Sequence, residues 1–309
     1  MRAVLDDALD LMPGGRILIE SAPGVGKTRL VAHTVDSFVP DDRLLLYESG
    51  QCTIGGHNIP YRPFVQVIRS RAGVVQDDDG AQIISKIERL MKRWLLRDGE
   101  TAGEASALSD FLSRMLGVST QEVPPADGQD REPDLTYVQD GLTEYYTRLL
   151  ERAPVLLFID DFMHASPQTR DVVQHLVQRF ADDPFTTILC ARTDPGVRLA
   201  HYLSLEGSSP PIELLLPPLS EADTRALVRA ALTRATSVPD PLVAEIARLA
   251  SGVPQIVVEA MYDLIESNVI QVEGDVWTID PQAQHTVRLP ESAEAVSYTH
   301  LTLPTNREV

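Results

Sequence analysis

The stretch that decides the fold is Ser21-Ala22-Pro23-Gly24-Val25-Gly26-Lys27-Thr28. Apolar residues 17–19 precede it, and residues 29–33 continue it with helical character, so it connects a strand to a helix. Glycines in such a connection allow successive backbone N–H groups to turn toward an anion, and the first turn of the helix adds the positive end of its dipole. A lysine at this position reaches the outer phosphates of a nucleotide. The stretch therefore predicts a phosphate-binding loop.

Within this loop we assign a role to each residue type. Lys27 is expected to bind phosphate, and the Thr28 hydroxyl is placed to bind Mg²⁺. Ser21 departs from the usual pattern, which has glycine six residues before the lysine, and serine tolerates a bend less freely than glycine. A glycine-rich turn without a ligand is the alternative interpretation. The remaining residues that we expect to surround the nucleotide are Pro23, Gly24, Val25, Gly26 and Arg29.

Composition limits the class of protein. The 309 residues, 43% hydrophobic and 23% charged, are typical of a soluble protein with one large domain and a smaller one. The net charge of −18 repels a phosphate backbone, so we expect no direct binding to nucleic acid. No apolar run is long enough to span a membrane, and residues 1–7 do not form a signal peptide. We therefore expect a cytoplasmic protein without membrane contact.

Short apolar runs alternate with helical patterns up to residue 216. Such short, continuously apolar runs are typical of strands buried on both faces of a parallel sheet. The alternation predicts an α/β fold of the P-loop NTPase type with a parallel five-stranded sheet. The expected strands are Arg16–Glu20, Arg43–Glu48, Val155–Asp160, Thr186–Ala191 and Ile212–Leu216. The expected helices are Lys27–Phe38, Arg62–Arg71, Gln82–Leu96, Ala105–Leu116, Leu135–Arg152 and Pro167–Phe180, with Gln121–Pro133 as a surface loop.

Beyond Leu216 the pattern predicts helices and one hairpin. Helices are expected to begin at Ser220, at Asp240-Pro241 and at Gln255. Residues Val269–Ile279 alternate around Gly274-Asp275, which predicts a β-hairpin. We therefore expect an α/β core over residues 1–217 and a small helical lid with the hairpin over residues 218–291.

The terminal stretch, residues 292–309, has no clear place in this fold. Residues 296–305 resemble the translation of a transposase adapter used in DNA sequencing libraries. We expect that the natural chain is cut near Ala295 and that this tail is an artefact. A real flexible terminus is the alternative.

A second group of candidate residues follows two of the expected strands. Val155–Asp160 ends in a pair of acids, and a buried strand delivers its last carboxylate to the edge of the sheet where ligands bind. Asp160 is then a candidate Mg²⁺ ligand and Asp161 a candidate for orienting the attacking water. A pair of helix-capping acids is the alternative. Arg192, at the end of the next strand, either contacts the γ-phosphate or is a solvated or Asp-paired arginine.

Four motifs together resemble a known family. They are PGVGKTRL at residues 23–30, residues 59–64, LLFIDDFMHASP at residues 156–167, and Ser251–Pro254. In this order they resemble an AAA-type ATPase module and are similar to the nucleotide-binding domain of STAND signalling NTPases. Such modules occur in large LuxR-type transcription regulators and attached to adenylate or guanylate cyclases. The resemblance covers roughly residues 1–291.

The resemblance implies roles for individual residues. Lys27 and Thr28 would bind phosphate and Mg²⁺, Asp160 the metal, and Arg192 would act as a sensor. Gly252 and Pro254 match the Gly-x-Pro motif with which the family's helical lid meets the nucleotide. The sequence departs from the family after the acidic strand, where the histidine is displaced by one position and a tryptophan is missing. The Gly-Arg-Glu motif upstream of the loop is also absent, which leads us to expect N-terminal truncation and a missing adenine contact.

These observations predict a signalling switch that binds ATP or ADP with Mg²⁺ and hydrolyses ATP slowly. We expect an output domain in the missing C-terminal part and nucleotide-dependent self-association. Two alternatives stay open. One is a nucleotide-gated scaffold without turnover, and the other, ranked last, is a P-loop kinase of small molecules.

Overall fold

The computed structural model describes residues 14–38, 45–53, 60–97, 99–118, 134–193, 199–206, 208, 210–273 and 276–279. The chain divides into two compact units. The first consists of Met1–Glu20 and Val31–Leu214, and the second of Ser21–Leu30 and Leu215–Val309. The phosphate loop is thus grouped with the C-terminal residues. The expected loop Gln121–Pro133, the turn Gly274-Asp275 and the tail 292–309 lie outside the described residues.

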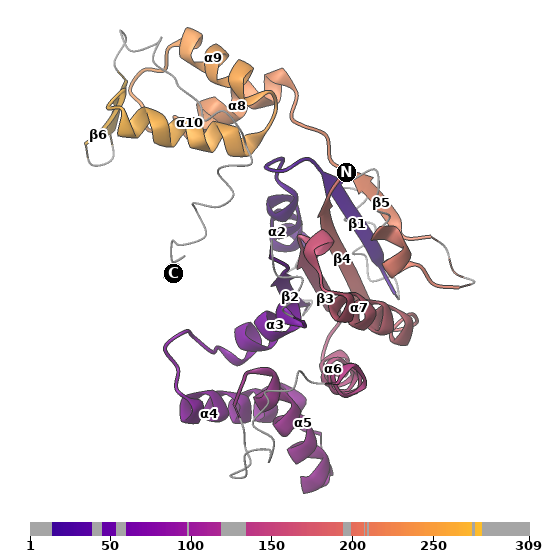
Figure 1. Cartoon of the computed structure of the whole chain (residues 1–309). Helices are drawn as coiled ribbons and strands as arrows, with labels where there is room; N and C mark the ends of the chain where they lie inside the picture. The colour runs from indigo at the N-terminus through magenta and orange to yellow at the C-terminus, as the bar shows by residue number, and fades with distance from the viewer. Residues whose placement is uncertain are drawn as a thin grey trace. The chain divides into compact units, whose positions relative to one another are not determined.

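A parallel five-stranded sheet forms the centre of the first unit (Figure 1). Its strands are β1 (Arg16–Ser21), β2 (Leu46–Gln51), β3 (Val155–Asp160), β4 (Phe185–Arg192) and β5 (Ile212–Leu215), in the order β2-β3-β4-β1-β5. All six residues of β3 are buried, as expected for a strand covered on both faces. The predicted fold class is confirmed. Because the strands are parallel, β1, β3 and β4 end at the same edge of the sheet.

The second strand lies further along the chain than its apolar run predicts. The expected range was Arg43–Glu48, but β2 pairs with β3 from Leu46↔Val155 to Gln51↔Asp160. The polar end can enter the sheet because Gly50 lets the backbone of α3 approach. A Cβ on Gly50 would lie 2.5 Å from the Pro63 carbonyl oxygen. The consequence is that Gln51 becomes the register partner of Asp160.

Helices cover this sheet and fill the long connection between β2 and β3. They are α2 (Lys27–Phe38), α3 (Arg62–Ala72), α4 (Gly80–Leu90), the π-turn η2 (Met91–Leu95), α5 (Ala102–Met115), α6 (Leu135–Leu150) and α7 (Pro167–Arg179), with short 3₁₀ segments η3 (Phe162–His164) and η4 (Leu199–Leu203). Capping boxes define where α4 and α5 begin. The Asp79 side chain accepts a hydrogen bond from the Gln82 N–H, and the Thr101 side chain accepts one from the Glu104 N–H. α6 packs against β3 and α7 as well as against α5, so it links the inserted helices to the sheet.

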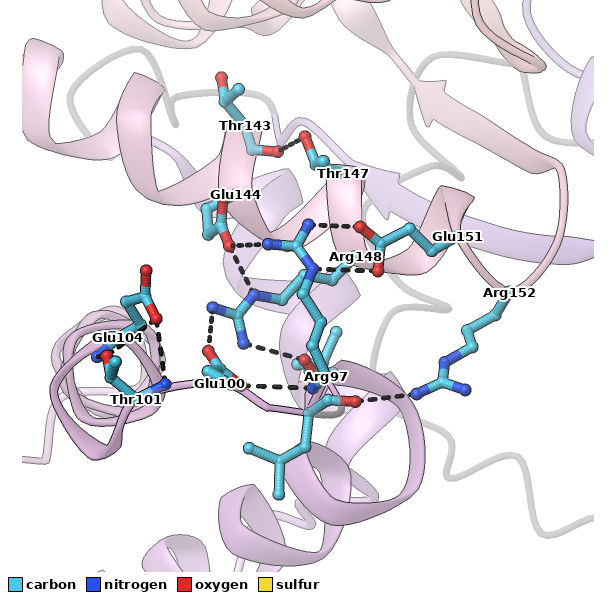
Figure 2. Close-up of polar contacts among 12 residues, drawn as sticks. Arg97, Glu100, Thr101, Glu104, Thr143, Glu144, Thr147, Arg148, Glu151 and Arg152 are labelled. Atoms are coloured by element: carbon cyan, nitrogen blue, oxygen red, sulfur yellow. Dashed lines mark hydrogen bonds and ion pairs between the residues drawn. The ribbon is translucent and has the colours of Figure 1, made fainter.

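An ion-pair network around the buried Arg148 side chain connects the inserted helices (Figure 2). The Arg148 side chain, 3% exposed, contacts the carboxylates of Glu100 at 2.5 Å and Glu144 at 2.6 Å. Its Nη1 donates to the Leu95 carbonyl oxygen at 2.9 Å. Arg97 extends the network with a two-bond contact to Glu151. The Arg148 guanidinium on α6 therefore joins the last residue of η2, Leu95, to Glu100, which precedes α5.

β5, the edge strand on the side of the sheet opposite β2, is largely exposed. β5 has four residues, of which Ile212, Glu213 and Leu215 are exposed. Partial burial, and then the nearby Glu213 carboxylate, raise the pKa of Glu20 on the neighbouring strand β1. Two carboxylates thus lie close together along this edge.

The second unit contains three helices and a hairpin beside the phosphate loop. The helices are α8 (Glu221–Ala231), α9 (Asp240–Ala250) and α10 (Pro254–Glu266), and the strands are β6 (Ile270–Glu273) and β7 (Val276–Ile279). β6 and β7 pair antiparallel from Ile270↔Ile279 to Glu273↔Val276, which confirms the predicted hairpin. Fully buried residues such as Leu242, Ile246 and Val257 form a separate core. Among the described residues, no helix is both long and apolar enough to cross a membrane.

Candidate functional site

The phosphate loop has the backbone that its glycines predict. Gly24 has φ 73° and Gly26 has φ 108°, and residues with a side chain rarely adopt a positive φ of this kind. A Cβ on Gly26 would meet no atom within 4 Å, so only the backbone conformation excludes a side chain there. Ser21 does not have a positive φ, and it is the last residue of β1. The bend at this position therefore does not need glycine.

Lys27, the first residue of α2, is folded back onto the loop. Its ammonium donates to the Ser21 hydroxyl at 3.0 Å and lies 3.3 Å from the Ser21 carbonyl oxygen and 3.4 Å from that of Ala22. The Ser21 hydroxyl in turn donates to the Ala22 carbonyl oxygen at 2.8 Å. Ser21 and Lys27 are both buried, whereas Thr28 and Arg29 are exposed. Ser21, which departs from the expected pattern, is thus in direct contact with Lys27, the lysine of that pattern.

The loop also contacts the start of α10, within the same unit. The Gln255 N–H donates to the Gly24 carbonyl oxygen at 3.2 Å. A Cβ on Gly24 would lie 2.8 Å from Gln255 atoms and 2.9 Å from Val253 Cγ1. Gly252 has φ 84°, and its carbonyl oxygen accepts from the Leu219 N–H at 2.8 Å. Val253 and Gln255, on either side of Pro254, the first residue of α10, therefore lie against Gly24 of the phosphate loop.

In the first unit, Asp160 and Asp161 follow each other at the end of β3. Asp160 is 7% exposed and its Oδ1 accepts from the Asp161 N–H at 2.8 Å. Asp161 has φ 51°, a left-handed conformation that is uncommon for a residue with a side chain. Gln51 Nε2, at the end of β2, donates to Asp161 Oδ2 at 3.1 Å. The Asp161 carboxylate is therefore held by a side chain from the neighbouring strand.

The structure also tests the alternative that these acids cap a helix. The cap of α7 is Ser166, whose hydroxyl accepts from the Thr169 N–H at 3.1 Å. Asp161 precedes η3 but makes no side-chain capping bond to it. The capping interpretation is therefore wrong for α7, and the Asp161 carboxylate is instead bonded to Gln51.

Arg192 is the last residue of β4. Because Ile159 pairs with Leu189, Arg192 lies two residues beyond the level of Asp160 along this parallel pair. Its side chain is half-buried, and it forms no ion pair or hydrogen bond with another described residue. Asp194, the neighbour that could pair with it, lies outside the described residues.

Three contacts at the site are absent from the sequence predictions: Ser21 with Lys27, Gln51 with Asp161, and Gln255 with Gly24. Gln51 could have been found, because the carboxyl ends of neighbouring parallel strands meet at one edge. Cavity size does not locate the site. A cavity of about 560 Å³ in the first unit, between α5 and α6, is lined by none of the predicted site residues.

The strand, glycine loop and helix, followed by a buried strand ending in two acids, define a nucleotide-binding protein of the P-loop class. A family model described as an AAA ATPase domain matches residues 1–189, more than half of the chain. The chain belongs to this family, and membership implies ATP binding. No curated protein matches the chain.

The solved structures that match this chain are distant in sequence. The Aeropyrum pernix Orc1 protein, in complex with DNA, has a TM-score of 0.51 at 14% identity, over 93% of this chain and 63% of that one. Drosophila ORC bound to DNA has a TM-score of 0.48 at 14% identity, over 93% and 57%. The Thermotoga maritima RuvB Holliday junction branch migration motor has 0.40 at 13%, over 92% and 64%. The chain spans less than two thirds of these proteins, and the first of them supports the fold alone.

Proposed function

We propose that this chain is the ATP-binding, slowly hydrolysing switch module of a cytoplasmic signalling regulator. The observation that carries the proposal is the hydrogen bond from the Gln255 N–H to the Gly24 carbonyl oxygen. Nucleotide phosphates would bind the N–H groups of this loop, so any adjustment of the loop would act directly on the first turn of α10. The clash that a Cβ on Gly24 would make with Val253 and Gln255 supports this coupling, because the loop has no free space on that side.

The side chains and backbone groups of the candidate site have the chemistry that binding of ATP and Mg²⁺ would require. Pro23, Gly24, Val25, Gly26 and Arg29 would surround the phosphates, and Lys27 would bind the outer ones. Mg²⁺ prefers oxygen ligands, and the Thr28 hydroxyl and the Asp160 carboxylate would supply them. Bound Mg²⁺ would neutralise the phosphate charge during hydrolysis.

Hydrolysis would depend on Asp161 and Arg192. The bond from Gln51 orients the Asp161 carboxylate, as a group that positions a water molecule requires. Arg192 would contact the γ-phosphate, and its lack of a partner among the described residues leaves its guanidinium available for an anion. Gly252 and Pro254 would report the state of the nucleotide to the helical region.

Hydrogen exchange tests the switch. With Mg²⁺ present, exchange in residues 252–266 should differ by at least threefold between the ADP-bound and the ATPγS-bound chain. Lys27→Ala should abolish the difference, because it removes the phosphate contact. Lys92→Ala, which changes an exposed lysine on η2, serves as the matched control and should keep it. Equal exchange with both nucleotides, despite saturation, would contradict a switch.

A single-turnover assay separates the switch from a scaffold that only binds nucleotide. The wild-type chain should release phosphate from bound ATP, and Asp161→Asn should slow the release by 10²-fold or more while ATP affinity stays within about threefold. A chain that binds ATP and releases no phosphate would instead be the nucleotide-gated scaffold.

A further inference from the structure

We propose that Ser21 is a positioning residue that holds Lys27 inside the loop and thereby lowers the affinity of the site for nucleotide di- and triphosphates. This inference rests on the proposed nucleotide site and concerns its regulation. Ser21 is the one residue of the loop that departs from the expected pattern. Glycine at this position would offer Lys27 no side-chain acceptor, whereas Ser21 offers a hydroxyl.

Ser21 is one of the residues that hydrogen-bond the Lys27 ammonium group. Lys27 Nζ donates to Ser21 Oγ at 3.0 Å, which is shorter than its distances to the two carbonyl oxygens. The hydroxyl is oriented for this, because it donates its own proton to the Ala22 carbonyl oxygen at 2.8 Å and therefore presents a lone pair to Lys27. Ser21 is 1% exposed and Lys27 8% exposed, so water competes weakly for either group.

Phosphate oxygens and Ser21 compete for the same ammonium protons. An ammonium group has three N–H donors, and Lys27 has three oxygens of Ser21 and Ala22 within 3.4 Å. A nucleotide that binds Lys27 has to displace at least one of them. Removal of the hydroxyl leaves the backbone acceptors in place but lowers the cost of this displacement. One hydrogen bond of ordinary net strength corresponds to roughly a 3- to 10-fold change in affinity.

The effect should depend on the length of the phosphate chain. In a loop of this class the lysine reaches the β- and γ-phosphates. The affinities for ATP and ADP should therefore both rise in Ser21→Ala, whereas the affinity for AMP should stay within twofold. A general loosening of the loop would change all three nucleotides together, so the comparison separates positioning from a structural role.

The first experiment measures the binding of ATP, ADP and AMP to the full chain by calorimetry. Ser21→Ala should bind ATP and ADP roughly 3- to 10-fold more tightly than the wild type. In a Lys27→Ala background the same change should have no effect on either affinity, because the competing partner is gone. The matched control is Ser113→Ala, which removes a buried hydroxyl in α5 that donates to the Ser109 carbonyl oxygen. It should leave all three affinities unchanged. Unchanged or weaker ATP binding by Ser21→Ala would overturn the proposal.

The second experiment needs no nucleotide. The chain has three lysines, Lys27, Lys86 and Lys92, so acetic anhydride labelling can be followed for each by mass spectrometry. Ser21→Ala should raise the labelling rate of Lys27 at least twofold relative to exposed Lys92, and Ser113→Ala should not. An unchanged Lys27-to-Lys92 labelling ratio would contradict the proposal that Ser21 holds Lys27, even where ATP binds normally. A raised ratio in a chain that binds no ATP would support the positioning of Lys27 by Ser21 and would contradict the proposed function instead.

Discussion

Arg148→Met should destabilise the first unit strongly, because it leaves a buried carboxylate without its partner. The Glu100 side chain is 5% exposed and contacts Arg148 at 2.5 Å. Loss of one partner of a buried ion pair costs about 3–5 kcal/mol, and methionine retains much of the apolar volume of the arginine stem. Glu144, at 41% exposure, can turn to water and adds little. We therefore expect a loss of about 3 kcal/mol in the free energy of unfolding.

Urea unfolding followed by Trp94 fluorescence measures this loss. The two tryptophans, Trp94 and Trp277, lie in different units, so a Trp277→Phe background makes the signal report the first unit alone. Arg97→Met is the matched control, because its ion pairs are 35–46% exposed and should contribute about 1 kcal/mol or less. Adding Glu100→Gln to Arg148→Met should recover part of the loss. A loss under about 1 kcal/mol, or one equal to that of Arg97→Met, would refute the reasoning.

Three further predictions concern other sites. Burial raises the pKa of Glu48 to about 7 despite its Arg71 partner, so the folded state holds this proton more tightly than the unfolded chain, whose pKa is about 4.5. The free energy of unfolding should therefore fall as the pH rises from about 4.5 to about 7, and Glu48→Gln should flatten this dependence in urea titrations at pH 5 and pH 8. Gly252→Ala would place its Cβ 2.4 Å from the Leu219 carbonyl oxygen at φ 84°, so thermal unfolding should show a loss of about 2 kcal/mol in the second unit, and no loss would contradict the contact. Gln51→Ala should slow single-turnover phosphate release at least fivefold with little change in ATP affinity, since it frees the Asp161 carboxylate to rotate; an unchanged rate would exclude this orienting role.

Much of the sheet and its helices could be predicted because their signal is local. β3 is a continuous apolar run that is buried along its whole length, so its range is predicted without error. The helix after the loop, Lys27–Phe38, also agrees with its prediction. β2 could not be placed as well, because its polar end is held by pairing with β3 and by the close approach of Pro63 to Gly50. Those contacts join residues far apart in the sequence.

The candidate site divides in the same way. Motif spacing predicts Lys27, Asp160 and Asp161 as site residues, since the chemistry of each is contained in a short stretch of chain. The groups that hold them come from elsewhere: Gln51 reaches Asp161 across 110 positions, and Gln255 reaches Gly24 across a still longer separation. Ser21 is an exception, because it is local and visible as a departure, but its contact with Lys27 depends on a side-chain conformation that sequence alone does not fix.

The open edge of the sheet has a consequence for how the protein behaves at high concentration. Among the residues that the structure describes, no strand lies beyond β5 in the sheet, and such an edge can accept a strand from another molecule. Its brevity and the carboxylates of Glu213 and Glu20 oppose this, because two such edges brought together would place like charges side by side. Acidification removes that charge, and the raised pKa of Glu20 means that neutralisation begins sooner than for an ordinary glutamate. Mildly acidic buffers should therefore promote edge-to-edge aggregation of the folded protein.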